Sequence, residues 1–168
     1  AMDRVRALGW TIVEVDLSSH LEAAKRLYEG AWLAERTAAV GEFIASNPDA
    51  VHAVTRGIIE AGRSLTAVDA FRDFYRLGEF RARGNAALAG IDVLMVPTAP
   101  TAYTVAAVAA EPVLLNARLG TYTNFVNLLD LCGLALPAAM RPDGIPFGIT
   151  LLAPAGRDAQ LAGIGRMF

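Results

Sequence analysis

The stretch from Leu134 to Pro154, LALPAAMRPDGIPFGITLLAP, contains two apolar segments separated by a polar turn. Residues 134–140 and 147–152 are apolar and predict two strands. The intervening residues 141–146, RPDGIP, hold the proline, aspartate and glycine that are typical of a tight turn. The stretch therefore predicts a strand, a turn and a second, buried strand, and it makes a sheet the centre of the fold.

Two other segments have strand character. Residues 91–96, within IDVLMVP, form a continuous apolar run, which is typical of a strand covered on both faces. Residues 11–16 contain a short β-branched run. We therefore expect four strands, at about 11–16, 91–96, 134–140 and 147–152, in one mixed β-sheet with covering helices. The predicted fold class is α/β.

The segment between the first two predicted strands has helical character. Ser19 and Glu22 have the spacing of a capping box, which predicts a helix over 20–29. Gly30 interrupts that helix, and the helical pattern resumes over 32–44.

Further helices are expected downstream. Asn47-Pro48 predicts the start of a helix that ends near Gly62. Thr66 with Asp69 predicts a capped helix to about residue 88. The apolar face of this helix is expected to contain Phe71, Phe74, Tyr75 and Ala82. Residues 98–116 are expected to form a loop, residues 123–132 a helix, and the residues after Asp158 a last helix.

The composition excludes several classes of protein. The net charge is −2, and no basic stripe is present that would bind nucleic acid or an anionic membrane. No segment has the pattern of a signal peptide or a membrane span, so a cytoplasmic protein is expected. Hydrophobic residues make up 54% of the 168 residues and charged residues only 19%. This excess of apolar residues predicts self-association or a large partner surface.

Residues that carry chemistry are scarce. His20, His52 and Cys132 are far apart in the sequence, so no metal site is expected, and no glycine-rich motif indicates a cofactor. The pair Ser18-Ser19 lies near Lys25, the only lysine, but capping of a helix is the favoured interpretation. No catalytic residue is therefore assigned.

Tyr28 and Arg36 lie on either side of the glycine in RLYEGAWLAERTAAV. In an unbroken helix they would be about 12 Å apart along the axis and roughly 80° apart around it. A bend at Gly30 would let both address one small anion, because arginine presents a planar fork of donors to a carboxylate. The alternative is an ordinary amphipathic surface.

Three stretches resemble the amidase-signature hydrolases. They are IDVLMVPTAPTAYT, the segment from Leu119 to Leu161, and LYEGAWLAERTAAV. The motifs TNFVNLLDL and YEGAWLAER are similar to those of the allophanate hydrolase branch in particular. The resemblance implies a partial amidase-signature fold, with 1–168 as the C-terminal part of a single amidase domain, helical over 18–90 and strand-rich over 91–168.

The resemblance also implies a function. Family members form an acyl-enzyme with a serine nucleophile and a lysine base, which lie in an N-terminal region that this sequence lacks. Tyr28 and Arg36 match the residues that contact substrate, which is a small anionic amide, allophanate. The chain is therefore expected to be inactive by itself and to supply substrate-binding residues, without a cofactor or metal. A fragment of an amidase with broader specificity, a non-catalytic interaction module and one subunit of a split enzyme remain alternatives.

Overall fold

The computed structural model describes residues 1–168 and has an α/β fold, which confirms the predicted class. Three strands form one antiparallel sheet in the order β1–β3–β2. The strands are β1 (Leu94–Pro97), β2 (Leu131–Met140) and β3 (Pro146–Pro154). The helices are α1 (Met2–Ala7), α2 (Ser18–Glu29), α3 (Trp32–Ser46), α4 (Ala53–Glu60), α5 (Ala67–Ala87), α6 (Val105–Ala110), α7 (Pro112–Leu119) and α8 (Asp158–Met167), with 3₁₀ turns η1 (Pro48–Ala50) and η2 (Ala61–Ser64).

The predicted strand–turn–strand is a hairpin of β2 and β3. Its turn is closed by hydrogen bonds from the N–H of Arg141 to the carbonyl of Ile145, 2.9 Å, and from Gly144 to Arg141, 2.9 Å. Gly144 has a φ of 79°, a conformation that glycine adopts without steric cost. The register shifts between Pro137 and Ala139, where proline offers no N–H to the ladder.

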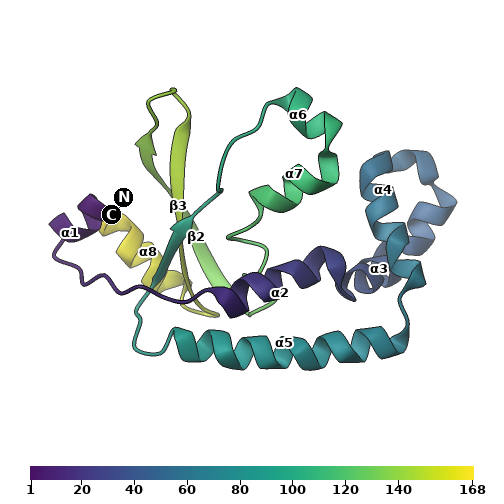
Figure 1. The fold of residues 1–168 in the computed structure, drawn as a ribbon, viewed down its shortest axis with the longest axis horizontal. Coiled ribbons are helices and arrows are strands. Elements are labelled where there is room, and N and C mark those ends of the chain that lie inside the picture. Colours follow the sequence, from purple (N-terminus) through teal and green to yellow (C-terminus); the bar gives the residue numbers. More distant parts are fainter.

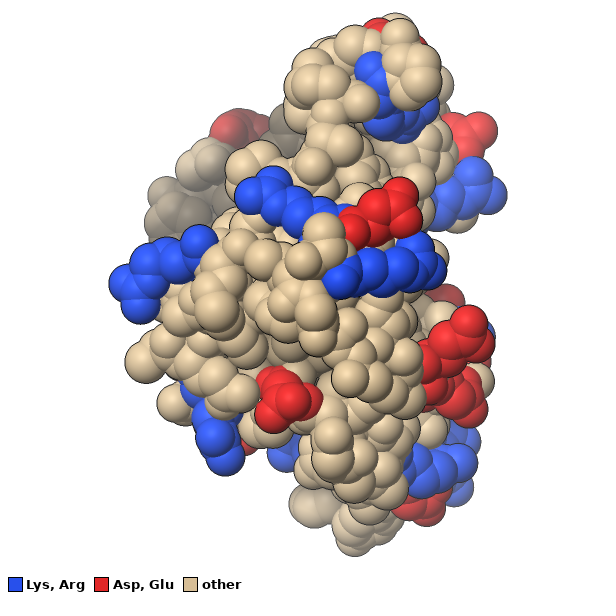
Figure 2. Space-filling model, turned by 90° about the vertical axis from the view of Figure 1, so that its left-hand side faces the viewer, with Lys and Arg blue, Asp and Glu red and all other residues tan.

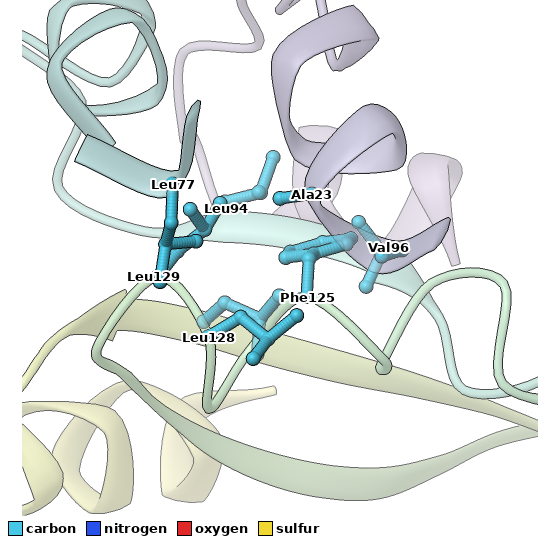
Figure 3. Close-up of a cluster of buried hydrophobic side chains, with 9 residues drawn as sticks. Ala23, Leu77, Leu94, Val96, Phe125, Leu128 and Leu129 are labelled. Carbon is cyan, nitrogen blue, oxygen red and sulfur yellow. The ribbon is translucent and has the colours of Figure 1, made fainter. Parts of the chain in front are cut away.

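Because β3 lies between β1 and β2, its apolar residues alternate between two cores. Leu152 packs in a cluster with α2, α5 and the turns at 121–130, and Figure 3 shows Ala23, Phe125 and Val96 in this cluster. Leu151 packs on the other face in a cluster with Leu161 of α8 and residues of α1. Figure 1 shows helices on both sides of the sheet. Residues of the predicted strand 91–96 also pack in both clusters, which confirms the expectation that this strand is covered on both faces.

The predicted strand at 11–16 is wrong, and the sheet is antiparallel throughout rather than mixed. The backbone of this segment forms no backbone hydrogen bond, and Val13 is 61% exposed. A β-branched run favours an extended chain, but a strand also needs a neighbouring strand with free N–H and C=O groups. This segment crosses from α1 to α2 without one (Figure 1).

The start of α2 also differs from the prediction. Ser19 forms no capping hydrogen bond, and α2 begins at Ser18, two residues before the predicted start. The carboxylate of Asp16 accepts hydrogen bonds from the backbone N–H of Ser18, 2.9 Å, and from its hydroxyl, 2.5 Å. The aspartate therefore stabilises the entry to the helix in place of the expected capping box.

The predicted capping box of α5 is confirmed. Thr66 Oγ1 accepts from the N–H of Asp69, 3.2 Å, and Asp69 accepts from the N–H of Thr66, 3.0 Å. The predicted apolar face of α5 is wrong, because Phe71, Phe74 and Tyr75 are exposed. The residues that α5 buries are Asp73, Leu77 and Gly84.

Three other segments differ from expectation. The single helix expected from Pro48 to Gly62 is divided into η1, α4 and η2. The expected loop 98–116 contains α6, capped by Thr104, and α7, which begins at Pro112. The expected helix at 123–132 is a series of turns that leads into β2. These turns place Phe125 and Leu128 in the core, so tertiary packing outweighs helical propensity here.

The surface carries charges of both signs. On the face in Figure 2, Lys and Arg side chains are interspersed with Asp and Glu and separated by uncharged surface. None of the helices combines the length and the apolar character needed to span a bilayer.

Candidate functional site

The chain bends sharply between α2 and α3. The last hydrogen bond of α2 runs from the N–H of Gly30 to the carbonyl of Arg26, 3.1 Å. Gly30 then has φ −117° and ψ −171°, an extended conformation, and Ala31 begins the turn into α3. The helix break expected at Gly30 is therefore present.

This bend brings Tyr28 and Arg36 together. The guanidinium carbon of Arg36 lies 5.3 Å from the centroid of the Tyr28 ring, within the range of a cation–π interaction. Both side chains are half-buried. The guanidinium of Arg36 forms no ion pair or side-chain hydrogen bond in this structure, so its N–H groups are free to donate. The role of the pair in binding substrate stays a prediction.

Asp73 of α5 holds the bend from the other side. Its Oδ2 atom accepts a hydrogen bond from the backbone N–H of Ala31 at 2.7 Å. A Cβ at Gly30 would overlap Oδ2 and would lie 2.8 Å from the carbonyl oxygen of Arg26. Glycine is therefore required here by close approach, because its backbone angles suit any residue.

Asp73 was not among the residues predicted from the sequence. Its neighbours Phe71 and Phe74 were predicted to belong to the apolar face of α5 that packs on the core. An aspartate beside that face is expected to be exposed to solvent. Asp73 lies one helical turn from Leu77 and on the same face of the helix, and this spacing indicates that Asp73 is buried. The spacing does not identify its hydrogen-bond partner, because Ala31 lies 42 positions away.

A larger groove lies at the β2–β3 hairpin. It has a volume of about 680 Å³ and is lined by residues 98–102, 135–141 and 145–148. The loop after β1 is fixed there, since Thr98 and Thr150 share a hydrogen bond between hydroxyls, 2.9 Å. The lining is mostly apolar and includes neither Tyr28 nor Arg36. A smaller cavity of about 240 Å³ lies beside the bend, between Trp32 of α3 and Phe74 of α5.

The lysine and two of the four serines are engaged in local interactions. Lys25 Nζ pairs with Glu22 at 2.5 Å, and the Ser18 hydroxyl donates to Asp16. The Ser64 hydroxyl donates to the carbonyl of Ala61, 2.9 Å. No group of three His, Cys, Asp or Glu side chains could hold a metal ion. The bend between α2 and α3 brings together an aromatic ring and a guanidinium without an ion pair.

The fold matches that of known amide hydrolases. The chain belongs to the amidase family, since the family model described as Amidase matches residues 1–162. An allophanate hydrolase of Kluyveromyces lactis superposes with a TM-score of 0.94 and 42% identity, over 99% of this chain and 28% of that chain. The urea amidolyase of the same organism gives a TM-score of 0.93 and 42% identity, over 99% of this chain and 10% of that chain.

A curated relative found by sequence comparison agrees with these structural matches. The urea amidolyase of Lachancea kluyveri is 41% identical over 170 residues, which is all of this chain and 9% of the relative. This chain is therefore homologous to the allophanate hydrolase portion of urea amidolyases, and it spans a small part of their length. A structure of an amidase with 22% identity and a TM-score of 0.79 shares the fold.

Proposed function

We propose that this chain is the C-terminal part of a single amidase domain, helical over 18–90 and strand-rich over 91–168, and that it recognises allophanate for a nucleophile outside these residues. Its similarity to an allophanate hydrolase over almost all of its own length supports this proposal. The complete enzyme would transfer the acyl group of allophanate to a serine and then to water, and would release ammonia and carbon dioxide.

The observation that carries the proposal is the position of Arg36 over Tyr28. Allophanate is small and planar and ends in a carboxylate. The guanidinium carbon lies 5.3 Å from the centroid of the Tyr28 ring, and the N–H groups of Arg36 would donate two parallel hydrogen bonds to that carboxylate. The hydroxyl of Tyr28 would donate or accept at the amide end. Arg36 and Tyr28 are thus assigned to binding and orientation, and the proposal assigns no proton transfer to this chain.

Steady-state kinetics of the complete enzyme test this role. A hydrogen bond to a charged group contributes about 1.5–3 kcal/mol. Arg36→Ala is therefore expected to raise KM for allophanate about 10- to 100-fold. KM for biuret, in which an amide replaces the carboxylate, is expected to stay near its starting value. Arg166→Ala, an exposed arginine on α8, is the matched control.

An unchanged KM for allophanate in Arg36→Ala would contradict the proposal and favour an amidase of broader specificity. The chain of 168 residues by itself is expected to show no turnover, because Lys25 pairs with Glu22 and contacts no serine. Serine-dependent hydrolysis by this chain alone would overturn that part.

The exposed apolar side chains support a further part of the proposal. Phe71, Phe74 and Tyr75 of α5 are each at least 60% exposed. We expect such a surface to be covered by another part of the domain or by a second copy. Sedimentation of the chain as a monomer at all concentrations would count against self-association.

A further inference from the structure

Asp73 is a carboxylate with an unusual environment. It is only 6% exposed, and it pairs with two arginines. Arg26 and Arg76 each place Nη1 3.8 Å from Oδ1, within ion-pair distance but beyond hydrogen-bond length. Its one short contact is the N–H of Ala31, 2.7 Å from Oδ2. Burial of a carboxylate is costly unless it is paired and hydrogen-bonded, so the two ion pairs and this hydrogen bond together compensate the burial of Asp73.

The N–H of Gly30 makes the last hydrogen bond of α2, so the N–H of Ala31 is the first that needs an acceptor outside this helix. In a continuous helix it would donate to the carbonyl four residues earlier, and the bend at Gly30 removes that partner. Asp73 replaces the lost acceptor and lies at the N-terminus of α3. A carboxylate there is favoured by the helix dipole. Asp73 thus accepts from the N–H of the N-cap residue of α3, as the N3 side chain does in a capping box.

The direction of α3 at this bend bears on where Arg36 lies. Tyr28 belongs to the last turn of α2, and Arg36 to the second turn of α3. Their relative position depends on the direction in which α3 leaves Gly30. In this structure the guanidinium lies 5.3 Å from the ring centroid. An unbroken helix would separate the two residues by about 12 Å along its axis.

We propose that Asp73 is a positioning residue, which holds the α2–α3 bend through the Ala31 N–H and thereby keeps Arg36 over Tyr28 for binding the substrate carboxylate. This inference rests on the proposed function, because it assumes that the pair binds substrate. Asp73 acts through Arg36 and has no contact with the substrate itself. Loss of the hydrogen bond therefore weakens binding of a carboxylate more than it slows the chemical step.

A double-mutant cycle in the complete enzyme tests this link. Asp73→Ala removes the acceptor and is expected to raise KM for allophanate about tenfold, with a smaller change in kcat. Asp73→Asn keeps an oxygen acceptor of the same size and is expected to stay within about threefold of the wild type. In the Arg36→Ala background, Asp73→Ala is expected to raise KM no further, because the two residues act through one interaction.

The outcomes separate the two proposals. If Arg36→Ala leaves KM for allophanate unchanged, the proposed function fails. If Arg36→Ala raises KM for allophanate and Asp73→Ala leaves KM unchanged, only the positioning role fails. The positioning role also fails if Asp73→Ala raises KM by the same factor in the Arg36→Ala background as in the wild type. Thermal unfolding checks that each variant folds. If Asp73→Ala does not fold, Gly30→Ala takes its place in the cycle, because it displaces the same carboxylate without changing a charge.

Discussion

The Oδ2 atom of Asp73 occupies the position that a Cβ at Gly30 would need. The contact joins α5 to the break between α2 and α3, and both residues are buried. It makes the glycine a requirement of packing rather than of backbone conformation, since its φ of −117° suits every residue.

Gly30→Ala is expected to displace the bend and to lower stability by about 1–3 kcal/mol, the usual effect of overpacking. KM for allophanate is expected to rise, because Arg36 then leaves the Tyr28 ring. Gly78→Ala, in the middle of α5, is the matched control, since a Cβ there meets no atom within 4 Å. That change is expected to stabilise the helix by about 0.5–1 kcal/mol. Chemical denaturation measures both, and equal effects of the two changes would contradict the packing argument.

Tyr28→Phe and Tyr28→Ala separate the hydroxyl from the ring. The phenylalanine keeps an aromatic face under Arg36, so KM for allophanate is expected to rise only a few-fold, by the loss of about one hydrogen bond. The alanine also removes the cation–π contact, worth about 0.5–2 kcal/mol, and is expected to raise KM about tenfold or more. Tyr75→Phe, on the exposed side of α5, serves as the control. Indistinguishable KM values for Tyr28→Phe and Tyr28→Ala would show that the ring does not orient Arg36.

His20 is expected to make stability depend on pH. Its side chain is 1% exposed and packs edge-on against Phe125, with ring centroids 5.2 Å apart. Burial lowers its pKa below the ordinary value of about 6.5, and the nearby Asp16 carboxylate opposes this shift without cancelling it. As the pH falls through about 6.5, the unfolded chain therefore binds a proton that the folded chain does not, and the free energy of unfolding decreases.

Urea denaturation between pH 8 and pH 5.5 measures this effect, with a slope from His20 of at most about 1.4 kcal/mol per pH unit. His20→Gln is expected to lose that slope. Asp16 does not contribute in this range, because hydrogen bonds from Ser18 hold its pKa below the ordinary carboxyl value. Parallel profiles for the wild type and His20→Gln would refute the assignment.

Thr66→Ala is expected to destabilise the chain by about 1 kcal/mol, because the N–H of Asp69 loses its acceptor at the start of α5. Thr55→Ala, at an exposed position within α4, is the control and is expected to be neutral or slightly stabilising. Midpoints of denaturation compare the two. A larger loss for Thr55→Ala would mean that the capping box does not hold α5.

Local patterns in the sequence predicted part of the fold. The turn residues at 141–146 and the apolar segments beside them were sufficient to predict the β2–β3 hairpin. The Thr66–Asp69 spacing was sufficient to predict the start of α5. The start of α2 was placed close to its observed position, although Asp16 and not Ser19 stabilises it. The helix predicted at 123–132 was wrong, because burial of Phe125 and Leu128 outweighs the helical pattern.

The sequence by itself determined the three strands of the sheet, the α5 cap, the break at Gly30 and the motif that contains Tyr28 and Arg36. Each of these depends on residues within a few positions of one another, whose conformational preferences act before any packing. Only the tertiary structure decided that α5 buries Asp73 and exposes Phe71 and Phe74, and that Arg36 lies over Tyr28. Those outcomes depend on a hydrogen bond across 42 positions, and the partner of a buried carboxylate is settled by which helices pack together.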